Sequence, residues 1–135
     1  MVPIVTIDGP SGSGKGTIAK ALALKLNWNY LDSGLLYRCF AFLHSENIGD
    51  IQDSFSRIEH KYNSKSENIL FDGNDITRAI RGKELTILSS QLSQKNEIRE
   101  QLMQIQKQYR KLPGLVAEGR DMSSKLFPDS KVKIF

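Results

Sequence analysis

Near its start the chain reads Ile4-Val5-Thr6-Ile7-Asp8-Gly9-Pro10-Ser11-Gly12-Ser13-Gly14-Lys15-Gly16-Thr17. The β-branched run at residues 4–7 is typical of a short buried strand. A glycine-rich turn follows, and a helix is expected from about Lys15 to Leu26. The apolar face of this helix is predicted to comprise Ile18, Ala21, Leu22 and Leu26. A strand, a glycine-rich turn and a helix in this order form the frame of a phosphate-binding loop.

The spacing of Gly9, Gly14 and Lys15 suits the phosphates of a nucleotide. Glycines permit positive φ and let backbone N–H groups surround a phosphate, while the helix N-terminus adds its positive end. Gly16 stands where the strict pattern has Ser or Thr, so we expect the hydroxyl of Thr17 to reach Mg²⁺ through water. The predicted residues that bind the phosphates of a nucleoside triphosphate are Gly9, Pro10, Ser11, Gly12, Ser13, Gly14, Lys15, Gly16 and Thr17.

The alternative is a flexible Gly/Ser turn that only joins a strand to a helix. The strand and helix on either side favour phosphate binding. A phosphate loop alone does not choose the reaction, because hydrolases, switches, transporters and small-molecule kinases all use it. A second anion site is needed to argue for phosphoryl transfer between nucleotides.

Composition narrows the class of protein. The chain has 135 residues, a net charge of +4 and one Cys, which cannot form an internal disulfide. No apolar run approaches the ~20 residues of a membrane span, and the start lacks the basic region of a signal peptide. We therefore expect a cytoplasmic protein without a membrane partner. The modest positive charge suits an anionic ligand, and the scattered aromatics show no pattern for binding nucleic acid.

The rest of the chain predicts an α/β fold with a parallel sheet and crossover helices. Residues 28–31 resemble a second strand, and the Asp32-Ser33-Gly34 sequence can cap a helix that carries Leu35, Leu36, Phe40 and Leu43. Residues 115–117 and 132–135 resemble two further buried strands.

The middle of the chain predicts a small α+β insert at about residues 45–82. A weak helical face at Ile51, Phe55 and Ile58 precedes a strand at Ile69–Phe71, which enters a tight turn. From Lys83 the helical pattern resumes. Its strongest stripe, ended by the following Pro-Gly pair, comprises Ile98, Leu102, Ile105, Tyr109 and Leu112.

Two arginines stand where a second phosphate could bind. Arg38 follows Ser33 by five residues, and Arg120 leaves the strand at residues 115–117, so both are expected at the carboxyl edge of the sheet. Asp121 can accept from an exocyclic amine such as cytosine N4, and Glu118 can orient Mg²⁺ through water. The alternatives are solvated arginines, an Arg–Asp pair and a strand-end charge that faces solvent.

Four segments together resemble the bacterial cytidylate kinases. They are Gly9–Thr17, Leu31–Arg38, Glu118–Asp121 and Phe127–Asp129. The phosphate loop is shared with adenylate kinases, whereas the Asp-Ser-Gly-x-x-Tyr-Arg and Gly-Arg-Asp segments are much more specific. The match runs in order along all 135 residues. The family usually has Gly where this chain has Ser123.

The resemblance implies a nucleoside-monophosphate kinase that transfers phosphate from ATP to CMP or dCMP with Mg²⁺. Lys15, Arg38 and Arg120 would be the catalytic residues, with no direct metal ligand. The implied acceptor-binding residues are Ser33, Arg38, Ser90, Arg99, Arg120 and Asp121.

The resemblance also implies that the family's chain continues past Phe135 into an arginine-rich helix and a lid. We therefore expect residues 1–135 to be the N-terminal part of one P-loop kinase domain, monomeric at full length. Alone, they are expected to show weak turnover or none. Two alternatives stay open: a kinase for another monophosphate or small metabolite, and a nucleotide-binding module without turnover.

Overall fold

The computed structural model describes residues 1–10 and 12–135. They form two compact units: unit 1 joins Met1–Gly34 to Gln101–Phe135, and unit 2 is Leu35–Glu100. Two helices, α2 (Ser33–Ser45) and α6 (Asn96–Lys107), carry the chain from one unit to the other. No helix among the described residues is long and apolar enough to cross a membrane.

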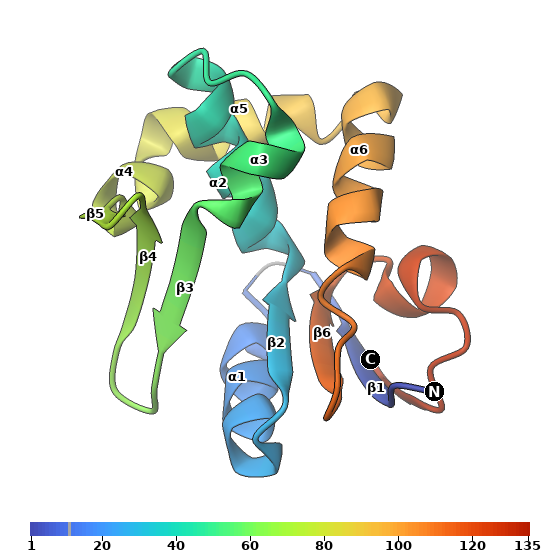
Figure 1. The fold of residues 1–135 in the computed structure, drawn as a ribbon. Helices are drawn as coiled ribbons and strands as arrows, with labels where there is room; N and C mark the ends of the chain where they lie inside the picture. The colour runs from blue at the N-terminus through green and yellow to red at the C-terminus, as the bar shows by residue number, and fades with distance from the viewer. Residues whose placement is uncertain (11) are drawn as a thin grey trace. The chain divides into compact units, whose positions relative to one another are not determined.

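Unit 1 is built on a parallel four-stranded sheet in the order β2-β6-β1-β7 (Figure 1). The strands are β1 (Ile4–Asp8), β2 (Asn29–Asp32), β6 (Leu115–Gly119) and β7 (Val132–Ile134). The helix α1 (Lys15–Leu26) connects β1 to β2. The predicted parallel α/β core is confirmed, and so are its four strands. The prediction that residues 132–135 are buried is wrong, because β7 is the last strand in the order of the sheet and its residues are exposed.

The register of the sheet sets which residues meet at its carboxyl edge. β1 pairs with β6 from Ile4 opposite Leu115 to Asp8 opposite Gly119. β2 pairs with the other side of β6 and places Asp32 opposite Glu118. Ligands of open α/β sheets bind at this edge. The residues that follow β1 and β6 are therefore brought together there.

The predicted apolar face of α1 is wrong. The helix buries Ala19 and Ala23, whereas Ile18 is 55% exposed and Leu26 is 40% exposed. Alanine has no side chain beyond Cβ, so this face lets the helix backbone lie close to the strands it contacts, β6, β2 and β1. The close approach of the α1 backbone to the sheet therefore decides which face of the helix is buried. Little space is left between helix and sheet for large side chains such as Ile18 and Leu26.

The π-helical turn η1 (Met122–Leu126) also packs on β1 and β6. Figure 1 shows it on the side of these strands away from α1. Met122, Leu126 and the following Phe127 are buried. π-helical turns are rare and are frequently found at functional sites. This one immediately follows Arg120 and Asp121.

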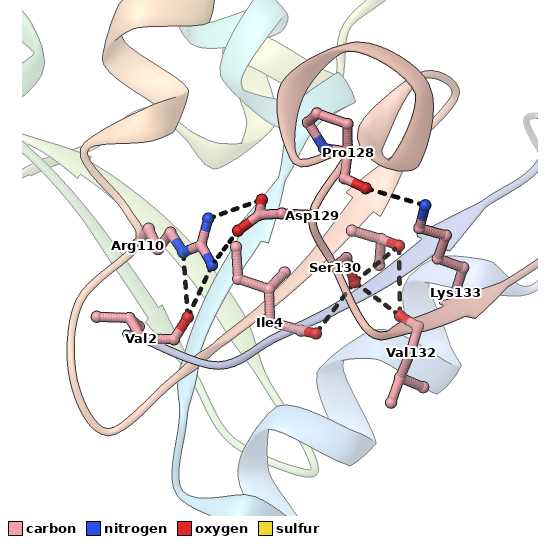
Figure 2. A network of polar contacts seen from close by, with 9 residues as sticks. Val2, Ile4, Arg110, Pro128, Asp129, Ser130, Val132 and Lys133 are labelled. Atoms are coloured by element: carbon pink, nitrogen blue, oxygen red, sulfur yellow. Dashed lines mark hydrogen bonds and ion pairs between the residues drawn. The ribbon is translucent and has the colours of Figure 1, made fainter.

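A polar network fastens β7 to β1 (Figure 2). The guanidinium of Arg110 donates to the Val2 carbonyl at 3.1 and 3.0 Å and to the carboxylate of Asp129 at 3.0 and 2.9 Å. The buried Ser130 hydroxyl lies 3.1 Å from the Ile4 carbonyl and 2.9 Å from that of Val132. These contacts lie near the amino ends of the strands, away from the carboxyl edge.

Unit 2 combines helices with an antiparallel sheet in the order β3-β4-β5. Its elements after α2 are α3 (Ile51–Ser56), β3 (Ile58–Tyr62), β4 (Glu67–Phe71), β5 (Asn74–Asp75), α4 (Thr77–Arg81) and α5 (Lys83–Leu92). Leu35 and Cys39 from α2 join Ile69, Ile76 and Ile80 in its core. The predicted insert of residues 45–82 lies within this unit, which extends beyond it at both ends.

In unit 2 one local prediction is wrong and another is confirmed. Ile58 opens strand β3 instead of completing a helical face, because Ile58, His60 and Tyr62 alternate with exposed Glu59 and Lys61, a period of two. The strand at Ile69–Phe71 and its tight turn are confirmed.

The predicted helical stripe up to Leu112 is too long. Helix α6 ends at Lys107, and Leu112 is 76% exposed. The stripe is correct at Leu102 and Ile105, which are buried. Beyond the helix the chain turns in order to enter β6, whose first amide donates to the Pro3 carbonyl.

Candidate phosphate-binding site

The loop between β1 and α1 has the backbone that its glycines predict. Gly12 has φ of 78° and Gly14 has φ of 85°, and Gly14 is the N-cap of α1. The Gly9 amide donates to the Gly119 carbonyl at 3.0 Å, which ties the start of the loop to the end of β6. Ser11, a predicted loop residue, lies outside the described residues. The loop therefore presents left-handed turns and a helix N-terminus, as phosphate binding requires.

Lys15 begins α1, and its ammonium folds back over the loop. Lys15 Nζ donates to the Pro10 carbonyl at 3.2 Å. An ammonium makes a stronger hydrogen bond with an anionic oxygen than with a neutral carbonyl. A phosphate in the loop would thus meet a cation that is already held beside it.

Glu118 faces the first turn of α1. Its side chain is buried, with only 4% of the residue exposed, and a Cβ added at Gly16 would lie 3.6 Å from Glu118 Oε2. A carboxylate oxygen is a ligand that suits Mg²⁺ or its bound water. Thr17, the next residue of α1, is exposed. The donor set therefore fits a magnesium ion held through water beside the loop.

Asp8 is a buried acid that was not among the predicted site residues. The Met122 amide donates to Asp8 Oδ1 at 2.7 Å, and the Ser123 amide donates to Asp8 Oδ2 at 3.0 Å. The Ser123 hydroxyl adds a third bond to Oδ2 at 2.7 Å. An acid that directly follows an apolar strand and precedes the loop glycine was the available signal.

These bonds hold the segment that contains Arg120 and Asp121. Arg120 is exposed and Asp121 is half-buried, and the Asp121 carbonyl accepts from the Lys125 amide at 3.0 Å. Ser123 stands where the family pattern has Gly. Among the described residues, the non-glycine residues with positive φ are Asn27, Asn47 and Asp72, and Ser123 is not one of them. The backbone of this segment therefore does not need a glycine there.

Ser33 lies against the end of β6. It is buried at the start of α2, and a Cβ at Gly119 would lie 3.0 Å from Ser33 Cβ. Unit 1 thus brings together, at the carboxyl edge of its sheet, five of the predicted site residues. They are Lys15, Ser33, Glu118, Arg120 and Asp121.

The other predicted acceptor-binding residues belong to unit 2. Arg38 lies on α2 and is half-buried, Ser90 lies on α5 and is exposed, and Arg99 lies on α6 and is half-buried. Their approach to the phosphate loop stays a prediction. The same unit has an open hollow of about 580 Å³, lined by Asp75, Thr77, Arg78, Arg81 and Gly82. None of the predicted site residues lines it.

Comparison with known proteins gives one consistent result. Residues 5–135 match the family described as cytidylate kinase. The cytidylate kinase of Coxiella burnetii (strain RSA 493 / Nine Mile phase I) is 43% identical over 143 residues, which cover 98% of this chain and 60% of that protein.

Two further relatives agree. The cytidylate kinase of Stutzerimonas stutzeri (strain A1501) is 42% identical, over 99% of this chain and 63% of its own length. The cytidylate kinase of Escherichia coli O1:K1 / APEC is 40% identical, over 100% of this chain and 63% of its own length. The chain therefore spans 60–63% of the length of these curated relatives.

Proposed function

The chain belongs to the cytidylate kinase family, and we propose that the protein transfers the terminal phosphoryl group of ATP to CMP or dCMP. The observation that carries this proposal is the joining of two segments at one sheet edge. The Gly9 amide of the phosphate loop bonds the Gly119 carbonyl at 3.0 Å, and Arg120 and Asp121 follow directly. A donor phosphate at the loop and an acceptor at this segment would be neighbours.

The phosphate loop binds ATP in this proposal. The backbone amides that follow Gly12 and Gly14 and the N-terminus of α1 face the phosphates, and Lys15 supplies the fixed positive charge. Mg²⁺, when bound, neutralises charge on the phosphate oxygens. Thr17 and Glu118 are the residues that would hold it.

Arg120 and Arg38 bind the acceptor phosphate, and Ser33 assists them. A guanidinium matches a phosphate through two parallel hydrogen bonds, so it fixes the direction of the acceptor as well as its place. The attacking group is an anionic phosphate oxygen, and the chemistry therefore needs no general base. Catalysis then rests on positioning and on neutralisation of charge.

Asp121 recognises the base of the acceptor. A carboxylate accepts a hydrogen bond from the N4 amine of cytosine, whereas uracil presents a carbonyl at that place and would repel the carboxylate. Ser90 and Arg99 complete the contacts with the base in this proposal. Asp121 directly follows Arg120, the proposed phosphate-binding residue, and this position supports a base-reading role for its carboxylate.

The test is a panel of monophosphate acceptors with the intact gene product and its Asp121→Ala variant. CMP and dCMP should be the best acceptors. The variant should lose roughly 1–3 kcal/mol of discrimination between CMP and UMP in kcat/KM, because the N4 donor loses its partner. Asp129→Asn is the matched control, since its carboxylate pairs with Arg110.

A different preferred acceptor in the panel would point to a kinase for another monophosphate. Binding of ATP with no acceptor turned over would point to a nucleotide-binding module. A CMP/UMP ratio that stays the same in Asp121→Ala would remove the base-reading role from Asp121.

A further inference from the structure

We propose that Asp8 is a positioning residue that fixes the Arg120–Asp121 segment against the phosphate loop and thereby sets the affinity for the acceptor nucleotide. The inference rests on the proposed function of Arg120 and Asp121. In it, Asp8 touches neither nucleotide and acts through the backbone of the segment.

The carboxylate of Asp8 has the geometry of a clamp. Each of its oxygens accepts one backbone amide, from Met122 at 2.7 Å and from Ser123 at 3.0 Å. Two amides on two oxygens fix the orientation of the peptide as well as its distance. Asp8 is only 8% exposed, so water competes little for these bonds. Hydrogen bonds to an ionised acceptor are roughly twice as strong as neutral ones.

The residue after Asp8 makes a further hydrogen bond to the end of β6. The Gly9 amide donates to the Gly119 carbonyl at 3.0 Å. Residues 8 and 9 therefore hold the chain on both sides of Arg120 and Asp121. The Lys125 and Leu126 amides also donate to the Asp121 carbonyl, at 3.0 and 3.3 Å. The backbone that carries both proposed acceptor-binding side chains is thus held at Gly119, at the Asp121 carbonyl and at the Met122 and Ser123 amides.

The position of Asp8 in the fold predicts an effect on nucleotide binding that a purely structural role would not produce. Asp8 is the last residue of β1 and directly precedes the phosphate loop. Its bonds join the two segments that hold donor and acceptor in the proposed function. A loss of these bonds should therefore change acceptor binding more than donor binding, because the loop keeps its glycines, Lys15 and α1.

The principal variant is Asp8→Asn in the intact gene product. Asparagine keeps the shape but offers an NH₂ donor to one of the two amides, so one amide loses its partner. We expect KM for CMP to rise by roughly tenfold or more, with a smaller CMP/UMP ratio. The Kd for an ATP analogue should change by less than about threefold, since only interactions with the acceptor segment are lost.

Hydrogen exchange provides a readout that is independent of activity. The Met122 and Ser123 amides should exchange slowly in the wild type and faster in Asp8→Asn. Ser123→Ala removes one of the three bonds and keeps both amides on the carboxylate. It should raise KM for CMP slightly, leave ATP binding unchanged and keep both amides protected. This variant tests the clamp even if Asp8→Asn does not fold.

Arg110→Ala is the control for stability. Arg110 fastens the amino end of the same sheet through Val2 and Asp129. The variant should lower the melting temperature while the ratio of the two nucleotide affinities stays that of the wild type. If Arg110→Ala and Asp8→Asn change that ratio equally, Asp8 is merely structural and the inference is wrong.

A double-mutant cycle with Arg120→Ala decides whether Asp8 acts through the segment. The effect of Asp8→Asn on KM for CMP should largely disappear in the Arg120→Ala background, because neighbouring groups that act together are not additive. If the effects of Asp8→Asn and Arg120→Ala on KM for CMP are additive, the inference about Asp8 is wrong, while the proposed function of the segment is unaffected. If Arg120→Ala by itself leaves CMP binding unchanged, the proposed function of the segment fails, and the inference fails with it.

Discussion

At Gly114 the absence of a side chain makes room for the indole ring of Trp28. A Cβ at this position would lie 2.4 Å from Trp28 Cδ2 and 2.6 Å from Cε2. The Gly114 carbonyl also accepts from the Asn29 amide at 2.9 Å, so the backbone at Gly114 is held against β2. The glycine is required by packing and not by its φ.

We expect Gly114→Ala to destabilise unit 1 by about 1–3 kcal/mol, the usual cost of forcing an added methyl group into a packed site. Urea denaturation followed by the fluorescence of Trp28 measures it. Gly49→Ala is the matched control, because nothing lies within 4 Å of a Cβ there. Equal stability of the two variants would show that the indole ring moves aside without cost.

Lys15 is the residue on which nucleotide binding is expected to depend most. Its Nζ lies 3.2 Å from the Pro10 carbonyl, at the phosphate loop. We expect Lys15→Ala to weaken the binding of an ATP analogue by about tenfold or more, since a hydrogen bond to a charged group is worth roughly 1.5–3 kcal/mol. Equilibrium titration measures the affinity. Lys25→Ala, at the exposed end of α1, is the control and should bind as the wild type does.

At the scale of elements, the β4–β5 hairpin depends on two residues with positive φ. Asp72 has φ of 50° and Gly73 has φ of 82°, which is the combination of a type I′ turn. The Arg57 side chain donates through Nε to both Asp72 carboxylate oxygens, at 2.9 and 3.1 Å. The turn is therefore held by backbone conformation and by an ion pair to the start of β3.

We expect Gly73→Ala to destabilise unit 2 by about 1–2 kcal/mol, the cost of placing a non-glycine residue in the left-handed region. A Cβ at Gly73 would meet nothing within 4 Å, so the cost is conformational only. Gly73→Asn should cost less, because Asn tolerates that region better. Thermal unfolding followed by circular dichroism distinguishes the two variants, and an equal loss in both would contradict the argument.

At the scale of the whole molecule, both units contain carboxyl groups whose pKa is lowered by hydrogen bonds in the folded state. In unit 2, the hydrogen bond from Arg57 lowers the pKa of Asp72, and hydrogen bonds from Thr77 lower the pKa of Asp75. In unit 1, the hydrogen bond from Arg110 lowers the pKa of Asp129. Each of these carboxyls binds a proton more readily in the unfolded chain.

Stability should therefore be lost in acid. A carboxyl with a lowered pKa in the folded state contributes stability above its unfolded pKa of about 4, and this contribution disappears as the pH falls through the folded value. We expect the melting temperature to fall below about pH 4. Asp72→Asn should flatten this dependence in circular dichroism, and Asp129→Asn should flatten it in the fluorescence of Trp28, the single tryptophan. An unchanged slope in both variants would contradict the linkage.

Local patterns are enough to predict the phosphate loop, its flanking strand and helix, and the strands that complete the parallel sheet. The reason is that glycine spacing, β-branched runs and helix-cap residues act over a few neighbouring positions. The segments around Arg38 and Arg120 are also visible in the sequence, because their resemblance to one family lies in consecutive residues. The functional roles of all the site residues, including Arg38, Ser90 and Arg99, remain predictions.

Other features depend on contacts between distant parts of the chain. Asp8 meets Met122 and Ser123 across 114 and 115 positions, and only the register of β1 on β6 brings them together. The buried face of α1 follows from how closely Ala19 and Ala23 let it approach the sheet, and Ile58 joins a strand because β4 pairs with it. These choices are made by packing and strand pairing, whose free energies have no counterpart in the local sequence.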